Sequence, residues 1–133
     1  MARGFLKLER DQGPCADLQP LDENTLVLDL DSDPLPRGPW DTITLLGVLE
    51  YLYHPAHALK KIAAAASHLV FSYCCCINKS DVSISERHRS GWINAMTEQN
   101  IRDEMSALGF HLSGRELFNS TTYFEQIVFE FTR

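Results

Sequence analysis

The sequence predicts an α/β domain with a mostly parallel sheet that ends in an antiparallel hairpin. Between residues 41 and 75, an apolar segment, a glycine, a helical apolar stripe and a second apolar segment follow one another, which is the order of a right-handed β-α-β unit. Near the end of the chain, two strand-like runs flank Asn119–Thr122, as in a β-hairpin. The 133 residues are 44% hydrophobic and 23% charged, which is typical of one globular domain.

The N-terminal part predicts two strands joined by an irregular connection. Gly4–Glu9 alternates apolar and polar residues, which indicates a short strand. Thr25–Leu30, TLVLDL, is β-branched and apolar enough for a buried parallel strand, and an acidic run with two prolines follows it. We therefore divide the single domain into an irregular or extra-strand region, a β-β-α-β half, a loop or lid, and a helix with a hairpin: residues 1–24, 25–75, 76–96 and 97–133.

The central strand is predicted at Asp41–Gly47, which is apolar on both faces and should have helices on both sides. Pro55 suits the first turn of the next helix, because its fixed φ and missing N–H cost nothing there. The apolar stripe of that helix consists of Leu59, Ile62, Ala63 and Ala66, while Lys60 and Lys61 should face water. His68–Cys75 then returns as a second buried strand.

The last third of the chain predicts a short surface helix or loop, a capped helix and the hairpin. Residues 77–90 are polar and break periodicity, so they are expected to lie over the sheet edge as a lid. Thr97 is a good N-cap and Gly109 a good helix end. The hairpin strands are Phe110–Phe118 and Tyr123–Thr132, with Ile127, Phe129 and Phe131 on one face.

Charge and cysteine content exclude several classes of function. A net charge of −6 without a basic stripe argues against nucleic-acid binding, and the clusters Lys60–Lys61 and Arg87–Arg89 are expected to be solvated. No apolar run is long enough to span a bilayer, so we expect a cytoplasmic protein without membrane contact. The cysteines are Cys15 and Cys74–Cys76, and they do not have the spacing of metal ligands. A place in the core or in the wall of a pocket is favoured over a zinc site or a redox-active thiol.

Three segments, in order, resemble the C-terminal two thirds of class I S-adenosylmethionine-dependent methyltransferases of the type 11 kind. The first is DSDPLP followed by Trp40–Asp41; the second is LGVLEYLYHP, residues 46–55; the third is residues 91–110, with GWIN and LGF. The resemblance covers Thr25–Arg133 and is most specific in the middle segment. It implies an incomplete Rossmann-like methyltransferase sheet in a truncated domain.

The resemblance also implies a set of site residues. The loop after the third strand would contact the adenine of S-adenosylmethionine, and the segment after the fourth strand its methionine part, which gives Asp31, Asp33, Leu46, Gly47 and Glu50. Tyr51, His54 and Trp92 would lie on the substrate side. Local chemistry leaves other roles open: the two aspartates as turn caps, Glu50 as a surface residue of a helix, and His54 as an N-cap.

The sequence departs from this family at its N-terminal side. Residues 1–133 contain no Gly-X-Gly loop after a buried strand, the element that lets a backbone approach the cofactor. If Gly4–Glu9 corresponds to the family's second strand, Glu9 or Asp11 would take the place of the ribose-binding acid. S-adenosylmethionine is therefore an uncertain cofactor on sequence grounds, and no metal is expected.

Without the family's first strand, Asp41–Gly47 would have an unpaired apolar edge, which native proteins avoid. Three solutions are open: Thr25–Leu30 closes up against it, another subunit covers it, or the sequence is a fragment. We expect direct closure together with self-association, through a homo-oligomeric or heteromeric partner at the edge near Asp41–Gly47.

Three functions follow from these observations. The first is a degenerate methyltransferase-like domain that acts as a binding or partner subunit. The second is a methyltransferase for a small molecule whose cofactor site is completed by another chain. The third is an interaction protein that docks through the hairpin aromatics Tyr123, Phe124, Phe129 and Phe131, although such residues more often form core.

Overall fold

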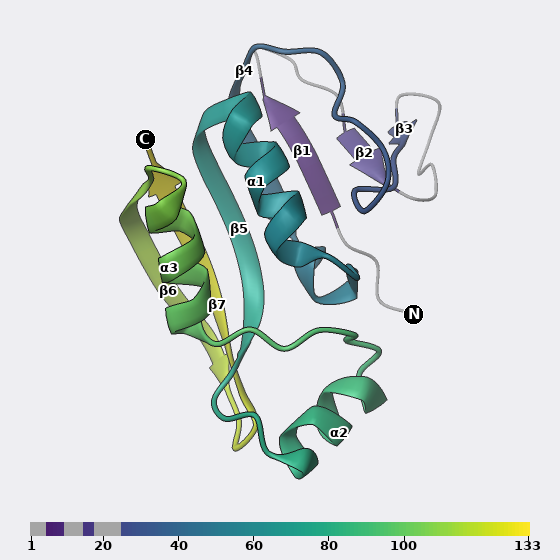
Figure 1. Cartoon of the computed structure of the whole chain (residues 1–133), viewed down its shortest axis with the longest axis vertical. Coiled ribbons are helices and arrows are strands. Elements are labelled where there is room, and N and C mark those ends of the chain that lie inside the picture. Colours follow the sequence, from purple (N-terminus) through teal and green to yellow (C-terminus); the bar gives the residue numbers. More distant parts are fainter. Residues whose placement is uncertain (1–4, 10–14, 18–24) are drawn as a thin grey trace.

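The computed structural model describes residues 5–9, 15–17 and 25–133, with side chains from residue 28 onward, and places them in one mixed sheet with helices (Figure 1). The strand order is β3-β2-β1-β4-β5-β7-β6. The strands are β1 (Phe5–Glu9), β2 (Cys15–Asp17), β3 (Thr25–Val27), β4 (Trp40–Leu46), β5 (Ala66–Cys76), β6 (His111–Ser120) and β7 (Phe124–Thr132). The helices are the 3-10 turn η1 (Leu49–Tyr51), α1 (Pro55–Ala65), α2 (Asp81–Arg89) and α3 (Glu98–Ala107).

The predicted β-α-β unit is confirmed. β4 and β5 pair in parallel, from Trp40 opposite Ala66 to Leu45 opposite Phe71. Helix α1 connects them, starts at Pro55 and buries Ala58, Leu59, Ile62 and Ala63. The predicted stripe differs at its end, because Ala66 is the first residue of β5 and no longer helical.

Helices cover only one face of this sheet in the described part of the chain, which corrects the expectation for the central strand. Figure 1 shows α1 and α3 on the same side of the sheet. In β4, Ile43 and Leu45 are fully buried, while the alternating Thr42 and Thr44 are only half-buried. This alternation with a period of two is that of a strand with one covered face.

The N-terminal strand β1 closes the edge of β4. It pairs with β4 in the antiparallel direction, from Phe5 opposite Leu46 to Glu9 opposite Thr42. The strand predicted at Gly4–Glu9 is thereby confirmed. Closure by Thr25–Leu30 is wrong, because β3 ends at Val27 and pairs with β2 at the far edge of the sheet.

The direction of the strands also corrects the predicted topology. Only β2–β3 and β4–β5 are parallel among the described pairs, while β1–β2, β1–β4, β5–β7 and β6–β7 are antiparallel. The sheet is thus mixed and not mostly parallel. Its parallel part is the β4–β5 pair, which fixes where a crevice at carboxyl strand ends can form.

The C-terminal elements agree with the sequence. Thr97 caps α3 through a capping box in which Asn100 takes the place of the usual Glu or Gln, and Gly109 follows the helix with a φ of 86°. The hairpin β6–β7 is present, and Phe129 and Phe131 are buried against Phe71 with ring centroids 5.6 Å away in both cases. These aromatics are core, as favoured, whereas Tyr123 and Phe124 are half-buried near the turn.

The polar segment before α3 contains a short helix, one of the two predicted alternatives. Ser80 caps α2 by accepting a hydrogen bond from the Ser83 N–H. In the part of the chain that the structure describes, none of the helices combines the length and apolar character that crossing a bilayer requires.

Candidate functional site

The candidate site lies at the carboxyl ends of β4 and β5, where η1 and α2 approach the edge of the sheet (Figure 1). Gly47 turns the chain out of β4 with a φ of 65°, a conformation that favours glycine. Its N–H donates a hydrogen bond of 2.8 Å to Ser72 Oγ on β5. Leu46, the last residue of β4, is 39% exposed. The strand-glycine-helix crevice predicted at Gly47 therefore has the expected backbone.

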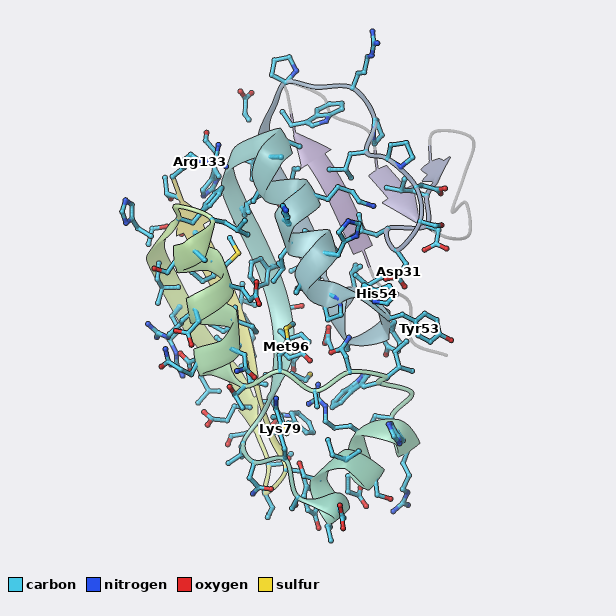
Figure 2. All side chains as sticks on the ribbon, viewed as in Figure 1. Asp31, Tyr53, His54, Lys79, Met96 and Arg133 are labelled. Atoms are coloured by element: carbon cyan, nitrogen blue, oxygen red, sulfur yellow. The ribbon has the colours of Figure 1, made fainter. Side chains whose placement is uncertain are left out.

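The two predicted adenine-side aspartates are engaged within the chain. The Asp31 carboxylate accepts hydrogen bonds from the backbone N–H groups of Tyr53 and His54, at 2.9 and 3.0 Å. Figure 2 shows these three residues together at the start of α1. Asp33 accepts from the Asp29 N–H at 2.7 Å. Both carboxylates thus make the contacts expected of turn caps, the alternative to a role in binding adenine. Asp31 also neutralises the positive end of the α1 dipole.

The side chains expected on the substrate side are spread around this edge. His54 is the N-cap residue of α1, but its exposed side chain makes no capping hydrogen bond. Tyr51 is half-buried, and its ring lies 3.7 Å from the position that a Cβ on Gly91 would take. Trp92 is half-buried and meets Phe124 edge-to-face at 5.0 Å. The Trp92 ring also lies 5.2 Å from the guanidinium carbon of the buried Arg87.

Glu50 is buried, with 3% of its surface exposed, so its interpretation as a surface residue is wrong. Burial raises the pKa of its carboxyl group, and hydrogen bonds at the backbone and Cys74 and the charge of Arg87 only partly offset this. Its Oε1 has no hydrogen-bond partner among the described residues. A buried carboxyl oxygen without a partner costs free energy and marks a functional candidate.

Arg87 is a second charged residue buried at this site, with 2% of its surface exposed. Its guanidinium donates three hydrogen bonds: Nε to Asn94 O at 2.9 Å, Nη1 to Cys74 O at 2.6 Å and Nη2 to Tyr73 Oη at 2.9 Å. The prediction that Arg87 is solvated is therefore wrong, although His88 and Arg89 are exposed as expected. Carbonyl and phenol oxygens replace water around this buried cation.

Tyr73 and Asn94 complete the network around Arg87, which we call the Arg87 cluster (Tyr73, Arg87, Trp92 and Asn94). The Tyr73 hydroxyl donates to Asn94 Oδ1 and accepts from the Met96 N–H at 2.9 Å. Asn94 Nδ2 donates to the carbonyls of Leu49 and Leu52 in and after η1. The rings of Tyr73 and Trp92 lie 5.4 and 5.2 Å from the guanidinium carbon, which adds cation–π attraction.

The three consecutive cysteines at the end of β5 are buried, as favoured from the sequence. Cys74, Cys75 and Cys76 are buried and free. Burial raises the pKa of the Cys74 and Cys75 thiols to about 12, so they are not thiolates at neutral pH. Among the described residues, no group of three or more metal-ligating side chains comes together.

The sequence did not single out Tyr73, Arg87 or Asn94. An aromatic in an apolar strand and one arginine of a basic cluster carry no local signal of pairing, since their partners lie 14 and 21 residues away in the chain. The predicted ribose acid also changes place: Glu9 lies opposite Thr42, at the end of β4 away from Gly47. Asp11 lies outside the described residues.

Comparison with solved structures identifies the fold. The magnesium protoporphyrin IX methyltransferase (ChlM) from Synechocystis PCC 6803 with bound SAH matches 83% of this chain and 50% of its own, with a TM-score of 0.61 and 19% identity. An S-adenosylmethionine dependent methyltransferase from Mesorhizobium loti matches 89% of this chain and 78% of its own, with a TM-score of 0.67 and 16% identity. The chain thus has a class I methyltransferase-like fold and spans about half the length of the ChlM structures.

The same fold occurs in a protein with another chemistry. The [4+2]-cyclase SpnF matches 85% of this chain and 57% of its own, with a TM-score of 0.62 and 11% identity. No protein-family model matches the sequence, and a search of curated proteins finds no match either. At these identities the likeness describes the fold, and function has to be argued from the site.

Proposed function

We propose that this methyltransferase-like chain is a non-catalytic domain that acts as a binding or partner subunit. The observation that carries the proposal is the direction of β1. In the family that the sequence resembles, the neighbour of the fourth strand is the first strand, and its carboxyl end carries the glycine loop of the cofactor site. Here the place beside β4 is taken by β1, which runs the other way.

The reversed direction places the carboxyl end of β1 away from the crevice. β1 ends at Glu9, opposite Thr42, whereas the crevice lies beyond Leu46, four residues further along β4. At about 3.3 Å per residue, the end of β1 and the crevice are roughly 13 Å apart. A segment elsewhere in the protein could supply a glycine loop beside Gly47 only by displacing β1.

The described residues also fit S-adenosylmethionine poorly. Asp31 is bound to the start of α1, and Glu50 is enclosed with an unpaired oxygen instead of lining an open surface. The Arg87 cluster fills the space next to η1 with contacts inside the chain. These contacts support a domain in which the edge of the sheet that would hold the cofactor is closed. They provide no group for a methyl transfer step.

The alternative is an enzyme that transfers a methyl group from S-adenosylmethionine after another chain completes its cofactor site. Its support is the retained backbone at Gly47 and the likeness to structures with bound SAM and SAH. A homo-oligomeric or heteromeric partner remains part of both proposals. The partner was expected at Asp41–Gly47 because that strand edge would be unpaired. Since β1 already pairs with this edge, the reason for a partner there no longer holds.

Calorimetric titration of the purified chain with S-adenosylmethionine and S-adenosylhomocysteine separates the two functions. We expect no heat of binding at ligand concentrations up to the millimolar range. Micromolar binding to the isolated chain would overturn the proposal. Light scattering at micromolar protein concentration tests the partner expectation separately, because a strictly monomeric particle rules out self-association.

A further inference from the structure

Helix α2 is attached to the rest of the domain by polar residues. Its buried residues are Ser83 and Arg87; of its two apolar side chains, Val82 is 59% exposed and Ile84 is half-buried. A surface helix is usually held by an apolar stripe that packs on the core, as Leu59 and Ile62 hold α1. Figure 1 shows α2 beyond the lower ends of β4 and β5, with connecting segments on both sides.

Several contacts of this segment with the sheet are made by one side chain. Arg87 reaches the Cys74 carbonyl and the Tyr73 hydroxyl, both on β5, and holds Asn94 through that residue's carbonyl. Asn94 in turn bonds the carbonyls of Leu49 and Leu52. One guanidinium therefore joins α2, β5 and, through Asn94, the η1 segment.

A second set of hydrogen bonds marks the base of the segment. The Cys76 N–H donates to Met96 O at 2.8 Å, and the Met96 N–H donates to Tyr73 Oη at 2.9 Å. The chain thus leaves the sheet at Cys76 and returns beside it at Met96. Residues 77–96 form a loop with close ends, which can move without breaking the β4–β5–β7 pairing.

We propose that residues 77–96 are a lid over the carboxyl ends of β4 and β5, and that Arg87 is the latch that keeps it closed. Opening moves the guanidinium from carbonyl and phenol acceptors into water, which solvates an arginine well. No residue of 77–96 belongs to the buried hydrophobic core, and Ile84, Trp92 and Met96 are only half-buried, so the free energy of opening is smaller than that of global unfolding. Opening also breaks the 3.0 Å hydrogen bond from the Ile93 N–H to Glu50 O and brings water to the buried Glu50.

Hydrogen exchange measured by mass spectrometry tests the latch. In the wild-type chain, peptides covering residues 81–96 should exchange at least roughly tenfold faster than peptides from β5 and β7, because local opening needs less free energy. Arg87→Lys keeps the charge but loses the planar set of three donors. It should speed exchange in residues 81–96 by a further factor of roughly ten, and leave β5 and β7 unchanged.

Arg89→Lys is the matched control. Arg89 lies on the same helix, its side chain is 76% exposed, and it pairs only with Glu86 at the surface. The control should exchange like the wild type. If Arg87→Lys leaves residues 81–96 unchanged, or speeds all strands equally, Arg87 is not a latch.

If Arg87→Lys does not fold, hydrogen exchange of the wild-type chain alone still tests the proposal. Exchange of residues 81–96 at the same rate as β5 and β7 means that the segment opens only with global unfolding, and the proposal fails. A second measurement uses Trp92, which stacks on the latch. In a Trp40→Phe background, acrylamide quenching of the remaining tryptophan should rise at least roughly twofold with Arg87→Lys and not with Arg89→Lys.

Discussion

An engineered disulfide can determine the direction of β1, on which the proposed function depends. In the antiparallel register, Glu9 lies opposite Thr42, so Glu9→Cys with Thr42→Cys should form a disulfide. A parallel β1 would instead bring Glu9 near Leu46, four residues further along β4. That separation corresponds to roughly 13 Å, well beyond the 7 Å at which Cα atoms can still be bridged.

The stabilisation follows from the loop that the disulfide closes. The bond joins residues 9 and 42, so the loop has 34 residues, counting both ends. Loss of chain entropy in the unfolded state then stabilises the fold by about 4 kcal/mol. For a domain of this size, this corresponds to a rise in Tm of roughly 10–20 °C.

The assay compares two double variants in a Cys15→Ser background, because Cys15 lies next to Lys7 on the neighbouring strand. After mild oxidation, peptide mapping should find the 9–42 bond, and thermal unfolding should shift upward by the expected amount. The variant with Glu9→Cys and Leu46→Cys should stay reduced. Formation of a 9–46 bond in its place would refute the antiparallel β1 and the functional argument built on it.

The remaining predictions concern single side chains. Asp31→Ala should lower the free energy of unfolding by about 1 kcal/mol, because α1 loses two hydrogen bonds at its N-terminus. The control is Ser32→Ala, a change at the neighbouring exposed residue. Equal urea midpoints for the two variants would contradict a capping role of Asp31. Phe129→Ala should cost about 4 kcal/mol in urea unfolding, and a loss under 1 kcal/mol would place this residue outside the core. The folded state binds the Glu50 proton more tightly than the unfolded state, so the free energy of unfolding should fall as pH rises from 4.5 through the raised pKa of Glu50. Glu50→Gln should flatten this pH dependence. Parallel curves of stability against pH for the wild type and the variant would show that Glu50 is not its source.

Much of the fold was predictable because its elements are set by local patterns. The stripe on α1, the cap at Thr97 and the alternation in β7 each depend on residues within one or two turns or strand lengths. The partner of β4 was not predictable, because strand pairing joins residues far apart in the chain. Nothing in GFLKLE distinguishes a neighbour of β4 from an outer strand.

The site shows the same division. The backbone at Gly47 was predictable from an apolar strand followed by a glycine and a helical segment. The environment of each polar side chain was not, because it depends on three elements meeting. Arg87 and Arg89 stand two residues apart in one basic cluster, yet one is 2% exposed and the other has a 76% exposed side chain. Sequence alone assigns both the same chemistry.

The pairing of polar groups connects the lid to the question of function. Arg87, Tyr73 and Asn94 satisfy one another, so the closed crevice offers few groups to a ligand. Among the described residues, the exception is Glu50 Oε1, which is buried and has no partner. Opening the lid would free the Arg87 donors next to this carboxyl group, and a ligand that binds there must keep the lid open. A binding partner of this domain should therefore speed exchange in residues 81–96 when it uses the crevice, and leave it unchanged when it binds elsewhere.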